Sequence, residues 1–269
     1  MRLPIRNLTH AIKSTQAFAT TLLRGGLGIM GTAHPKQPEK ALILYEHEAC
    51  PYCRRVREVM THLNLDYVSH PSPHKGQLYR QQLKQLTGKT QVPYLVDENT
   101  GEQIIESQDI IDYLFAHYSS EGQTPDKFRV DNDDGATVLG KVASATSLMR
   151  GVKAKHPAKN KTRGQPEQLL ELYGFEASPF CRLVREKLSA LELGYINHNV
   201  ARERLQDIGI GSKHLTLGEY RPLKGGKRER IKNEVVQDKM QFPYFVDPNT
   251  GTQMYESKDI IDYLDKTYG

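Results

Sequence analysis

The sequence of 269 residues contains no tryptophan, only three cysteines and no long hydrophobic run. A small and odd number of cysteines argues against a secreted protein held together by disulfides. A conventional transmembrane helix would need about 18 consecutive uncharged apolar residues, so none is predicted. The nearest candidate, residues 17–30, is interrupted by Arg24 and three glycines. A chain of this length is expected to hold about two domains.

Acidic residues are absent from the first 38 positions of the chain. The basic side chains in this stretch are Arg2, Arg6, Lys13, Arg24 and Lys36. Of the 37 basic side chains these five leave 32, which balance the 32 acidic ones and account for the net charge of +5. The neutral body has no basic field for nucleic acid, which excludes that class of partner. We interpret residues 1–38 as a basic leader, either a solvated tail, a transit peptide or a membrane-surface helix.

The chain contains an internal repeat, because three motifs recur in the same order. They are LYEHEACPYCR and LYGFEASPFCR (residues 44–54 and 172–182), VPYLVD and FPYFVD (92–97 and 242–247), and ESQDIIDYL and ESKDIIDYL (106–114 and 256–264). This agreement predicts two copies of one domain.

The spacing of the motifs sets the expected domain boundaries. We place the first copy at residues 40–118, the second at 168–269 and a polar linker at 119–167. The offset between the copies grows from 128 at the cysteines to 150 at the prolines, so the second copy contains 22 additional residues. We place this insertion near residues 209–236.

The sequence within each copy predicts the element order βαβ followed by ββα. In the first copy the expected strands are at 41–45, near 67–68, at 93–96 and at 103–105, and the expected helices follow Pro51, span 77–86 and begin at Ser107. Proline suits the first turn of a helix, where its missing N–H is not needed. Ser107 is expected to cap the last helix.

Two features of the linker have alternative interpretations. Residues 137–149 are compatible with a modest amphipathic helix. Residues 150–163 contain six basic side chains and no acidic one. We interpret this run first as a solvated linker and second as a surface that meets anionic lipid.

Cys50 and Cys53 are the first candidates for catalytic residues. A cysteine at a helix N-terminus is expected to have a lowered pKa, because the helix dipole and free N–H groups stabilise its thiolate. Cys53, one turn later, is placed to attack a mixed disulfide at Cys50. A zinc site would need two further ligands, and His47 with His74 would form an irregular set, so no metal is predicted. A glutathione-ligated iron–sulfur cluster at Cys50 is a minor alternative.

Cys50-Pro51-Tyr52-Cys53, between a strand and a helix, resembles the active site of dithiol glutaredoxins. Val92-Pro93 followed by Glu106-Ser107 resembles the glutathione-binding half of the N-terminal, thioredoxin-like domain of glutathione transferases. The resemblance covers both copies. It implies an α/β protein of two tandem thioredoxin-like domains, each a four-stranded mixed sheet flanked by helices.

The resemblance also implies that glutathione is the ligand. Tyr52, Val92 and Pro93 would position its cysteinyl part, with the Val92–Pro93 bond cis, and Glu106 with Ser107 would hold the γ-glutamyl end. The charges of a γ-glutamyl group fit these residues. Its ammonium group suits the Glu106 carboxylate, and its carboxylate suits the Ser107 hydroxyl and the N–H groups at the helix N-terminus.

The second copy departs from the first at the position of the nucleophile, where Ser178 replaces Cys50. A serine cannot form a mixed disulfide, and Ala177 to Arg182 resembles the start of serine-type glutathione transferases, whose hydroxyl activates the glutathione thiol. The residues expected to bind glutathione in this copy are Phe242, Pro243, Glu256 and Ser257. A degenerate, purely structural second copy is the alternative. No helical domain follows, so an ordinary pocket for a second, hydrophobic substrate is not expected.

We predict a glutathione-binding thiol–disulfide oxidoreductase of glutaredoxin type, acting through Cys50 and Cys53 on small-molecule or protein disulfides. The alternatives are a glutathione transferase or isomerase that uses Ser178 or Cys50, and a non-catalytic glutathione-sensing scaffold. The expected location is cytoplasmic. Peripheral membrane contact through the basic segments and organellar targeting by the leader stay open, as does the oligomeric state.

Overall fold

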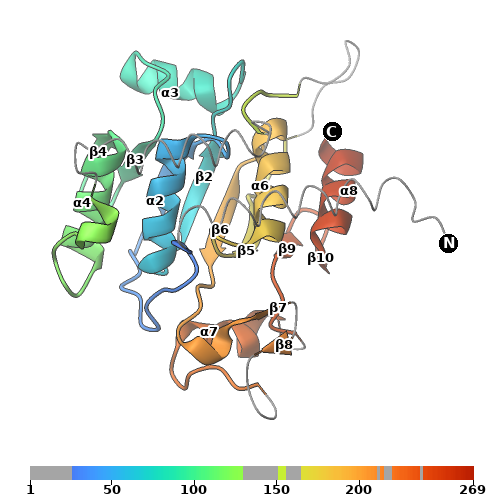
Figure 1. Ribbon diagram of the computed structural model, residues 1–269. Helices are drawn as coiled ribbons and strands as arrows, with labels where there is room; N and C mark the ends of the chain where they lie inside the picture. The colour runs from blue at the N-terminus through green and yellow to red at the C-terminus, as the bar shows by residue number, and fades with distance from the viewer. Residues whose placement is uncertain (1–25, 130–150, 156–164, 211–212, 215–219, 237–238) are drawn as a thin grey trace.

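The structure is a computed structural model that describes residues 26–129, 151–155, 165–210, 213–214, 220–236 and 239–269 (Figure 1). The first copy of the repeat consists of β1 (Leu42–Glu46), α2 (Pro51–His62), β2 (Tyr67–Pro71), α3 (Tyr79–Thr87), β3 (Tyr94–Asp97), β4 (Glu102–Ile105) and α4 (Ser107–Tyr118). The second copy consists of β5 (Leu170–Gly174), α6 (Pro179–Leu191), β6 (Tyr195–Asn199), α7 (Lys227–Ile231), β9 (Tyr244–Asp247), β10 (Thr252–Tyr255) and α8 (Ser257–Tyr268). Both copies follow the predicted order.

All eight of these strands belong to one continuous sheet, in the order β10-β9-β5-β6-β2-β1-β3-β4. Each copy contributes four neighbouring strands, and the copies are joined because β2 pairs antiparallel with β6. This continuity was not predicted from the sequence. The fold is therefore a mixed α/β protein in which two thioredoxin-like units share a single sheet.

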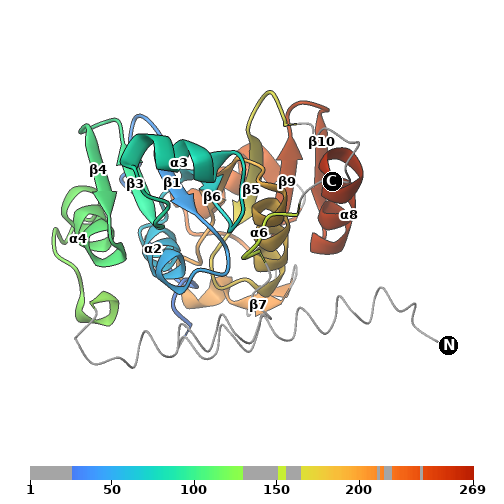
Figure 2. The same cartoon turned by 90° about the horizontal axis from the view of Figure 1, so that it is seen from above.

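Strand alternation divides the apolar side chains between the two faces of the sheet. On one face, α4, α2, α6 and α8 lie side by side (Figure 2) and cover two separate cores, one in each copy. On the other face, Tyr45 and Tyr94 pack against Leu83 of α3. Their repeat counterparts Tyr173 and Tyr244 pack in the same way against α7 and the π-helical turn that follows it (Lys232–Val236).

The additional residues of the second copy lie mainly before α7. Residues 72–78 join β2 to α3, whereas residues 200–226 join β6 to α7. This longer connection includes a 3-10 turn (Leu205–Asp207) and a ribbon of β7 (Gly209–Ile210) and β8 (Lys213–His214). The range predicted for the insertion, 209–236, thus includes α7 itself.

The segments that precede each copy pack against the body of the protein. Ala177 N–H donates to the Gly28 carbonyl at 3.1 Å, and Leu27 packs on the first core. Ahead of the second copy, His74 N–H donates to the Val152 carbonyl at 2.6 Å. The described part of the predicted leader and residues 151–155 of the basic run are therefore in contact with both copies.

The sequence just before these contacts is also repeated, a signal that the sequence analysis missed. Residues 19–25 read ATTLLRG and residues 145–151 read ATSLMRG. The duplicated unit thus begins upstream of the boundaries predicted at residues 40 and 168. Residues 1–25 of the leader and the helix expected at 137–149 lie outside the described residues. No helix in the described part of the chain has the length and apolar character needed to cross a membrane.

Candidate active site

Cys50 is the N-cap residue of α2, with extended backbone angles of φ −72° and ψ 121°. Its sulfur accepts a hydrogen bond from the Cys53 backbone N–H at 3.2 Å, and its side chain is 6 % exposed. The pKa of Cys50 is lowered by a hydrogen bond from the Cys53 thiol and by the N–H groups of Cys53 and Tyr52, although burial opposes this. The predicted nucleophile is therefore placed where a thiolate is stabilised.

The pKa of Cys53 is shifted in the opposite direction from that of Cys50. Burial raises its pKa well above the ordinary value, and the neighbouring Cys50 and Glu46 raise it further. The side chain is fully buried one turn into α2, whereas Tyr52 between the two cysteines is 43 % exposed. The pair thus combines one sulfur that favours the thiolate with one that retains its proton.

The Val92–Pro93 peptide bond lies beside this pair and is cis. Cys50 Sγ is 4.0 Å from the Val92 carbonyl oxygen. Pro93 is buried and Val92 is half-buried. The structure therefore brings together the thiol and the two residues expected to contact the cysteinyl part of glutathione.

Ser107 does not cap α4 as expected, because Glu106 occupies the N-cap position with a positive φ of 74°. Ser107 is the first residue of the helix, and its hydroxyl accepts a hydrogen bond from Arg55 Nη1 at 3.3 Å. Glu106 is exposed and accepts a hydrogen bond from Gln91. No side chain caps the helix, so its first N–H groups are available to a carboxylate.

The second copy repeats this frame around Ser178. Its hydroxyl is at the N-cap of α6 and accepts a hydrogen bond from Cys181 N–H at 3.3 Å. The Phe242–Pro243 bond is cis, and Gln241 donates to Glu256 at 2.6 Å, as Gln91 does to Glu106. Ser257 is buried at the first position of α8. The predicted residues therefore form two separate sets, one in each copy, and only the first set has a thiol at the N-cap position.

The family model for the N-terminal domain of glutathione S-transferase matches this chain twice, at residues 44–122 and 172–269. The chain belongs to this family. No curated protein and no solved structure matches it. The two matched regions coincide with the two copies of the repeat, so this glutathione S-transferase-type protein carries its N-terminal domain in tandem.

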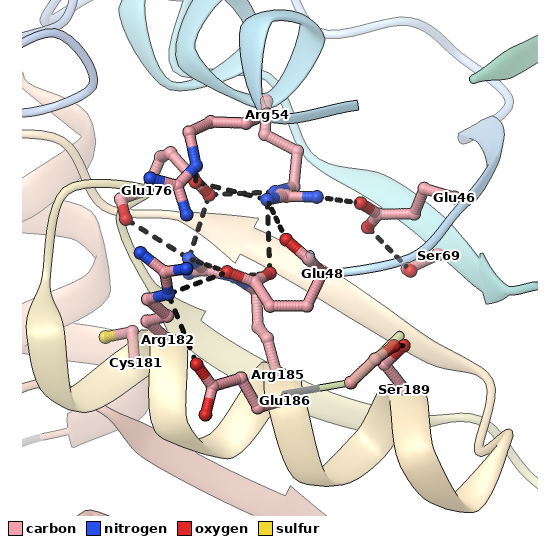
Figure 3. A network of polar contacts seen from close by, with 12 residues as sticks. Glu46, Glu48, Arg54, Ser69, Glu176, Cys181, Arg182, Arg185, Glu186 and Ser189 are labelled. Carbon is pink, nitrogen blue, oxygen red and sulfur yellow. Dashed lines mark hydrogen bonds and ion pairs between the residues drawn. The ribbon is translucent and has the colours of Figure 1, made fainter. Parts of the chain in front are cut away.

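Beneath the two helix N-termini the tandem domains share a buried network of arginines and glutamates, which sequence reasoning missed (Figure 3). Arg57 of α2 donates to both carboxylate oxygens of Glu176 in the second copy, at 2.9 and 3.2 Å. In return, Arg185 of α6 binds Glu48 of the first copy, with Nε 2.9 Å from Oε2. Glu48 and Glu176 are each two residues before the N-cap, so the network connects the loops that precede α2 and α6.

A signal for this network was present in the repeat. Glu48, Arg54 and Arg57 recur in the second copy as Glu176, Arg182 and Arg185, all at the offset of 128. Charged residues so close to the apolar side of a helix are usually solvated. Their burial becomes evident only when the two copies are placed side by side.

The geometry of a metal site is not found among the residues that the structure describes, since no three His, Cys, Asp or Glu side chains are grouped suitably. His47 and His74, the ligands considered for zinc, are neighbours with ring centroids 5.5 Å apart. Burial lowers the pKa of His47 to about 3, so this ring is neutral.

Proposed function

We propose that this protein is a glutathione-dependent thiol–disulfide oxidoreductase of glutaredoxin type, with Cys50 as the nucleophile and Cys53 as the resolving thiol. The observation that carries the proposal is the position of Cys50, whose sulfur accepts an N–H at the start of α2 beside the Val92 carbonyl. The lowered pKa of Cys50 suits attack on a disulfide, and the raised pKa of Cys53 keeps this thiol protonated until the resolving step.

The remaining residues of the first copy fit glutathione as a substrate. The Val92 carbonyl, 4.0 Å from Cys50 Sγ, suits pairing with the cysteinyl part, and Tyr52, two residues after Cys50, is exposed to a ligand. Ser107 and the uncapped N–H groups of α4 suit the γ-glutamyl carboxylate, while Glu106 suits the ammonium group. Arg55 connects this end of the site to α2 through its bond to Ser107.

The proposed reaction proceeds by two thiol–disulfide exchanges. The Cys50 thiolate attacks the glutathionyl sulfur of a mixed disulfide, the S–S bond breaks, and the client thiolate leaves with the electron pair and takes a proton. Cys50 then transfers that sulfur to a second glutathione thiolate, which yields oxidised glutathione and restores the Cys50 thiolate. In the alternative second step Cys53 loses its proton and attacks Cys50, which releases glutathione and leaves a Cys50–Cys53 disulfide for two glutathione molecules to reduce.

The test is glutathione-dependent reduction of a small mixed disulfide by wild-type protein and three cysteine variants. We expect Cys50→Ser to abolish turnover and Cys53→Ser to retain much of it. Cys181→Ser is the matched control, because Cys181 is a buried thiol at the resolving position of the second copy, and it should behave as wild type. Equal activity in the Cys50→Ser protein would overturn the assignment.

A second candidate function is supported by Ser178. Its hydroxyl occupies the same N-cap position as Cys50, next to a cis-proline and a Glu–Ser pair at the start of a helix. This arrangement suits activation of the glutathione thiol by a hydrogen bond, followed by attack on an electrophile. Conversion of an electrophile that is lost in Ser178→Ala and retained in Cys50→Ser would favour this function.

A further inference from the structure

Within residues 44–54 and 172–182 the two copies differ at four positions, and two of these differences bear on the thiols. Cys50 is replaced by Ser178, and four residues earlier Glu46 is replaced by Gly174. The other two differences replace His47 by Phe175 and Tyr52 by Phe180, whereas the resolving-position cysteine and the arginines of the network are the same in both copies. The copy with the nucleophile therefore has a carboxylate that the copy without it lacks.

The position held by Glu46 is beside the resolving cysteine. In the second copy a Cβ atom added to Gly174 would lie 2.5 Å from Cys181 Sγ, so the last residue of this strand contacts the cysteine one turn into the helix. Glu46 occupies that place in the first copy and is buried. The carboxylate consequently lies close to the Cys50–Cys53 pair.

Glu46 is held in place by two partners. Ser69 Oγ donates to Oε1 at 2.9 Å, and Arg57 Nη1 forms an ion pair with Oε2. Arg57 is itself fixed by Glu176 of the second copy and lies 3.2 Å from a Glu48 oxygen. Glu176 of the second copy, Arg57 and Glu46 are thus in continuous contact, and Glu46 lies beside Cys53.

We propose that Glu46 and Arg57 are positioning residues for the Cys50–Cys53 pair, and that the second copy completes this arrangement through Glu176. Burial raises the pKa of Glu46, while the ion pair with Arg57 and the hydrogen bond from Ser69 favour its ionised form. The positive charge of Arg57 favours the Cys50 thiolate, whereas ionised Glu46 beside Cys53 disfavours a second thiolate. Of the two cysteines, only Cys50 is therefore expected to form a thiolate. The second copy needs no carboxylate at Gly174, because Ser178 forms no thiolate.

The proposal rests on the proposed function, and its test measures an equilibrium rather than turnover. The full-length protein is equilibrated with mixtures of reduced and oxidised glutathione, quenched with acid and alkylated. Mass spectrometry then gives the fraction with a Cys50–Cys53 disulfide. The balanced reaction is disulfide plus two glutathione, giving dithiol plus oxidised glutathione.

Glu46→Gln removes the carboxylate and leaves the charge of Arg57 less compensated, so it stabilises the Cys50 thiolate and hence the reduced pair. We expect the equilibrium to move about tenfold toward the dithiol, which corresponds to about 30 mV for this two-electron couple. Glu176→Gln should move it in the same direction by a smaller factor. The control is Glu186→Gln, which removes a buried carboxylate that binds Arg182 in the same network, and it should leave the equilibrium within about twofold of wild type.

A shift in Glu46→Gln no larger than in Glu186→Gln would overturn the proposal. If Glu46→Gln does not fold, Ser69→Ala decides. The Ser69 hydroxyl favours the ionised form of Glu46, so its removal raises the pKa of this carboxyl, favours the neutral form and should shift the equilibrium in the same direction as Glu46→Gln; no shift would overturn the proposal. A shifted equilibrium in a protein without turnover on mixed disulfides would refute the proposed function alone. Absence of the Cys50–Cys53 disulfide in every glutathione mixture would refute this proposal and the resolving role of Cys53, whereas turnover through Cys50 alone would still be judged by the Cys50→Ser variant.

Discussion

Val68 and Ile196 face each other at the centre of the eight-stranded sheet. The two residues are equivalent positions of the repeat, and on either side Tyr67 faces Asn197 while Ser69 faces Tyr195. The pairing of β2 with β6 is thus symmetric about this point, and the two copies are related as the subunits of a twofold dimer. The arrangement covers the β2 edge of one copy with the β6 edge of the other.

A fragment of residues 26–129 should therefore self-associate. Without the second copy, β2 becomes an exposed edge, and Arg57 and Glu48 lose their partners Glu176 and Arg185. A second fragment offers the same residue types in the same places, so pairing through β2 is expected. Light scattering should give the mass of a dimer, and the full chain measured at the same concentration is the reference. A folded monomeric fragment would contradict this expectation.

Removal of one arginine from the shared network should destabilise the whole protein. Arg185 is buried between Glu48 and Glu176, with nitrogen–oxygen distances of 2.9 Å to each. Arg185→Met leaves both carboxylates with too little positive charge and is expected to cost about 3–5 kcal/mol of unfolding free energy. Denaturant unfolding of the full chain measures this cost.

The matched control is Lys40→Met, which breaks the exposed ion pair of Lys40 with Glu98 at 3.7 Å. An exposed pair of this kind contributes about 0–1 kcal/mol, so the variant should unfold near wild type. Similar losses in the two variants would show that the network adds little to stability.

The sequence predicted the parts of the site that are local. The position of Cys50 before α2 follows from a short apolar strand, a proline in the first turn and a helical spacing of apolar residues. The cis bond before Pro93 followed from the resemblance. The N-cap of α4 was misassigned by one residue, because Glu106 adopts a positive φ and Ser107 instead binds Arg55.

The features that depend on contact between the copies were not predicted. Nothing in residues 67–71 or 195–199 distinguishes a strand that pairs with its counterpart from a strand with a free edge. The same is true of Arg57 and Glu176, which are 119 positions apart and look like ordinary surface charges until β2 meets β6. Long-range pairing of this kind leaves no local periodicity to recognise.

The three thiols should differ strongly in their reaction with iodoacetamide. The pKa of Cys50 is lowered, first by the hydrogen bond from Cys53, whereas burial raises the pKa of Cys53 and of Cys181. At near-neutral pH only Cys50 should be modified in the folded protein, since the thiolate is the reactive form. Mass spectrometry after timed alkylation over a range of pH checks this. In Cys53→Ala the reaction of Cys50 should require a higher pH, and an unchanged profile would contradict the assigned cause.

His198 and its repeat counterpart His70 should give the unfolding free energy opposite pH dependences. Burial alone would lower the pKa of His198, but Asp66 at 3.2 Å and Glu171 at 3.4 Å outweigh it and raise the pKa. Its stabilising contribution is therefore complete below about pH 6.5 and is lost as pH rises through the raised folded-state value. Burial lowers the pKa of His70 to about 4, so its contribution is complete above about pH 6.5 and is lost as pH falls.

Phenylalanine is a suitable replacement at both positions, because each histidine ring stacks on a tyrosine, Tyr173 or Tyr79, with centroids 4.3 Å apart. His198→Phe should remove part of the stability loss on the alkaline side and cost about 1–3 kcal/mol at acidic pH. His70→Phe should reduce the loss on the acidic side. Unfolding free energies measured across this pH range test both, and identical profiles for the two variants would refute the assignment.

Binding of glutathione should distinguish the two copies through equivalent serines. Ser107 and Ser257 each begin a helix that follows a glutamate of positive φ, and each copy has the same Gln–Glu hydrogen bond. We expect calorimetric titration to find two molecules of glutathione per chain. A hydroxyl that donates to a carboxylate contributes about 1.5–3 kcal/mol, so Ser107→Ala should weaken one site by about tenfold to a hundredfold and Ser257→Ala the other. Timed alkylation of Cys50 should be unchanged in both variants, which separates loss of the ligand from disruption of the thiol. A single site that responds to Ser107→Ala alone would mean that the second copy supports the first through Glu176 and Arg185 and binds no substrate of its own.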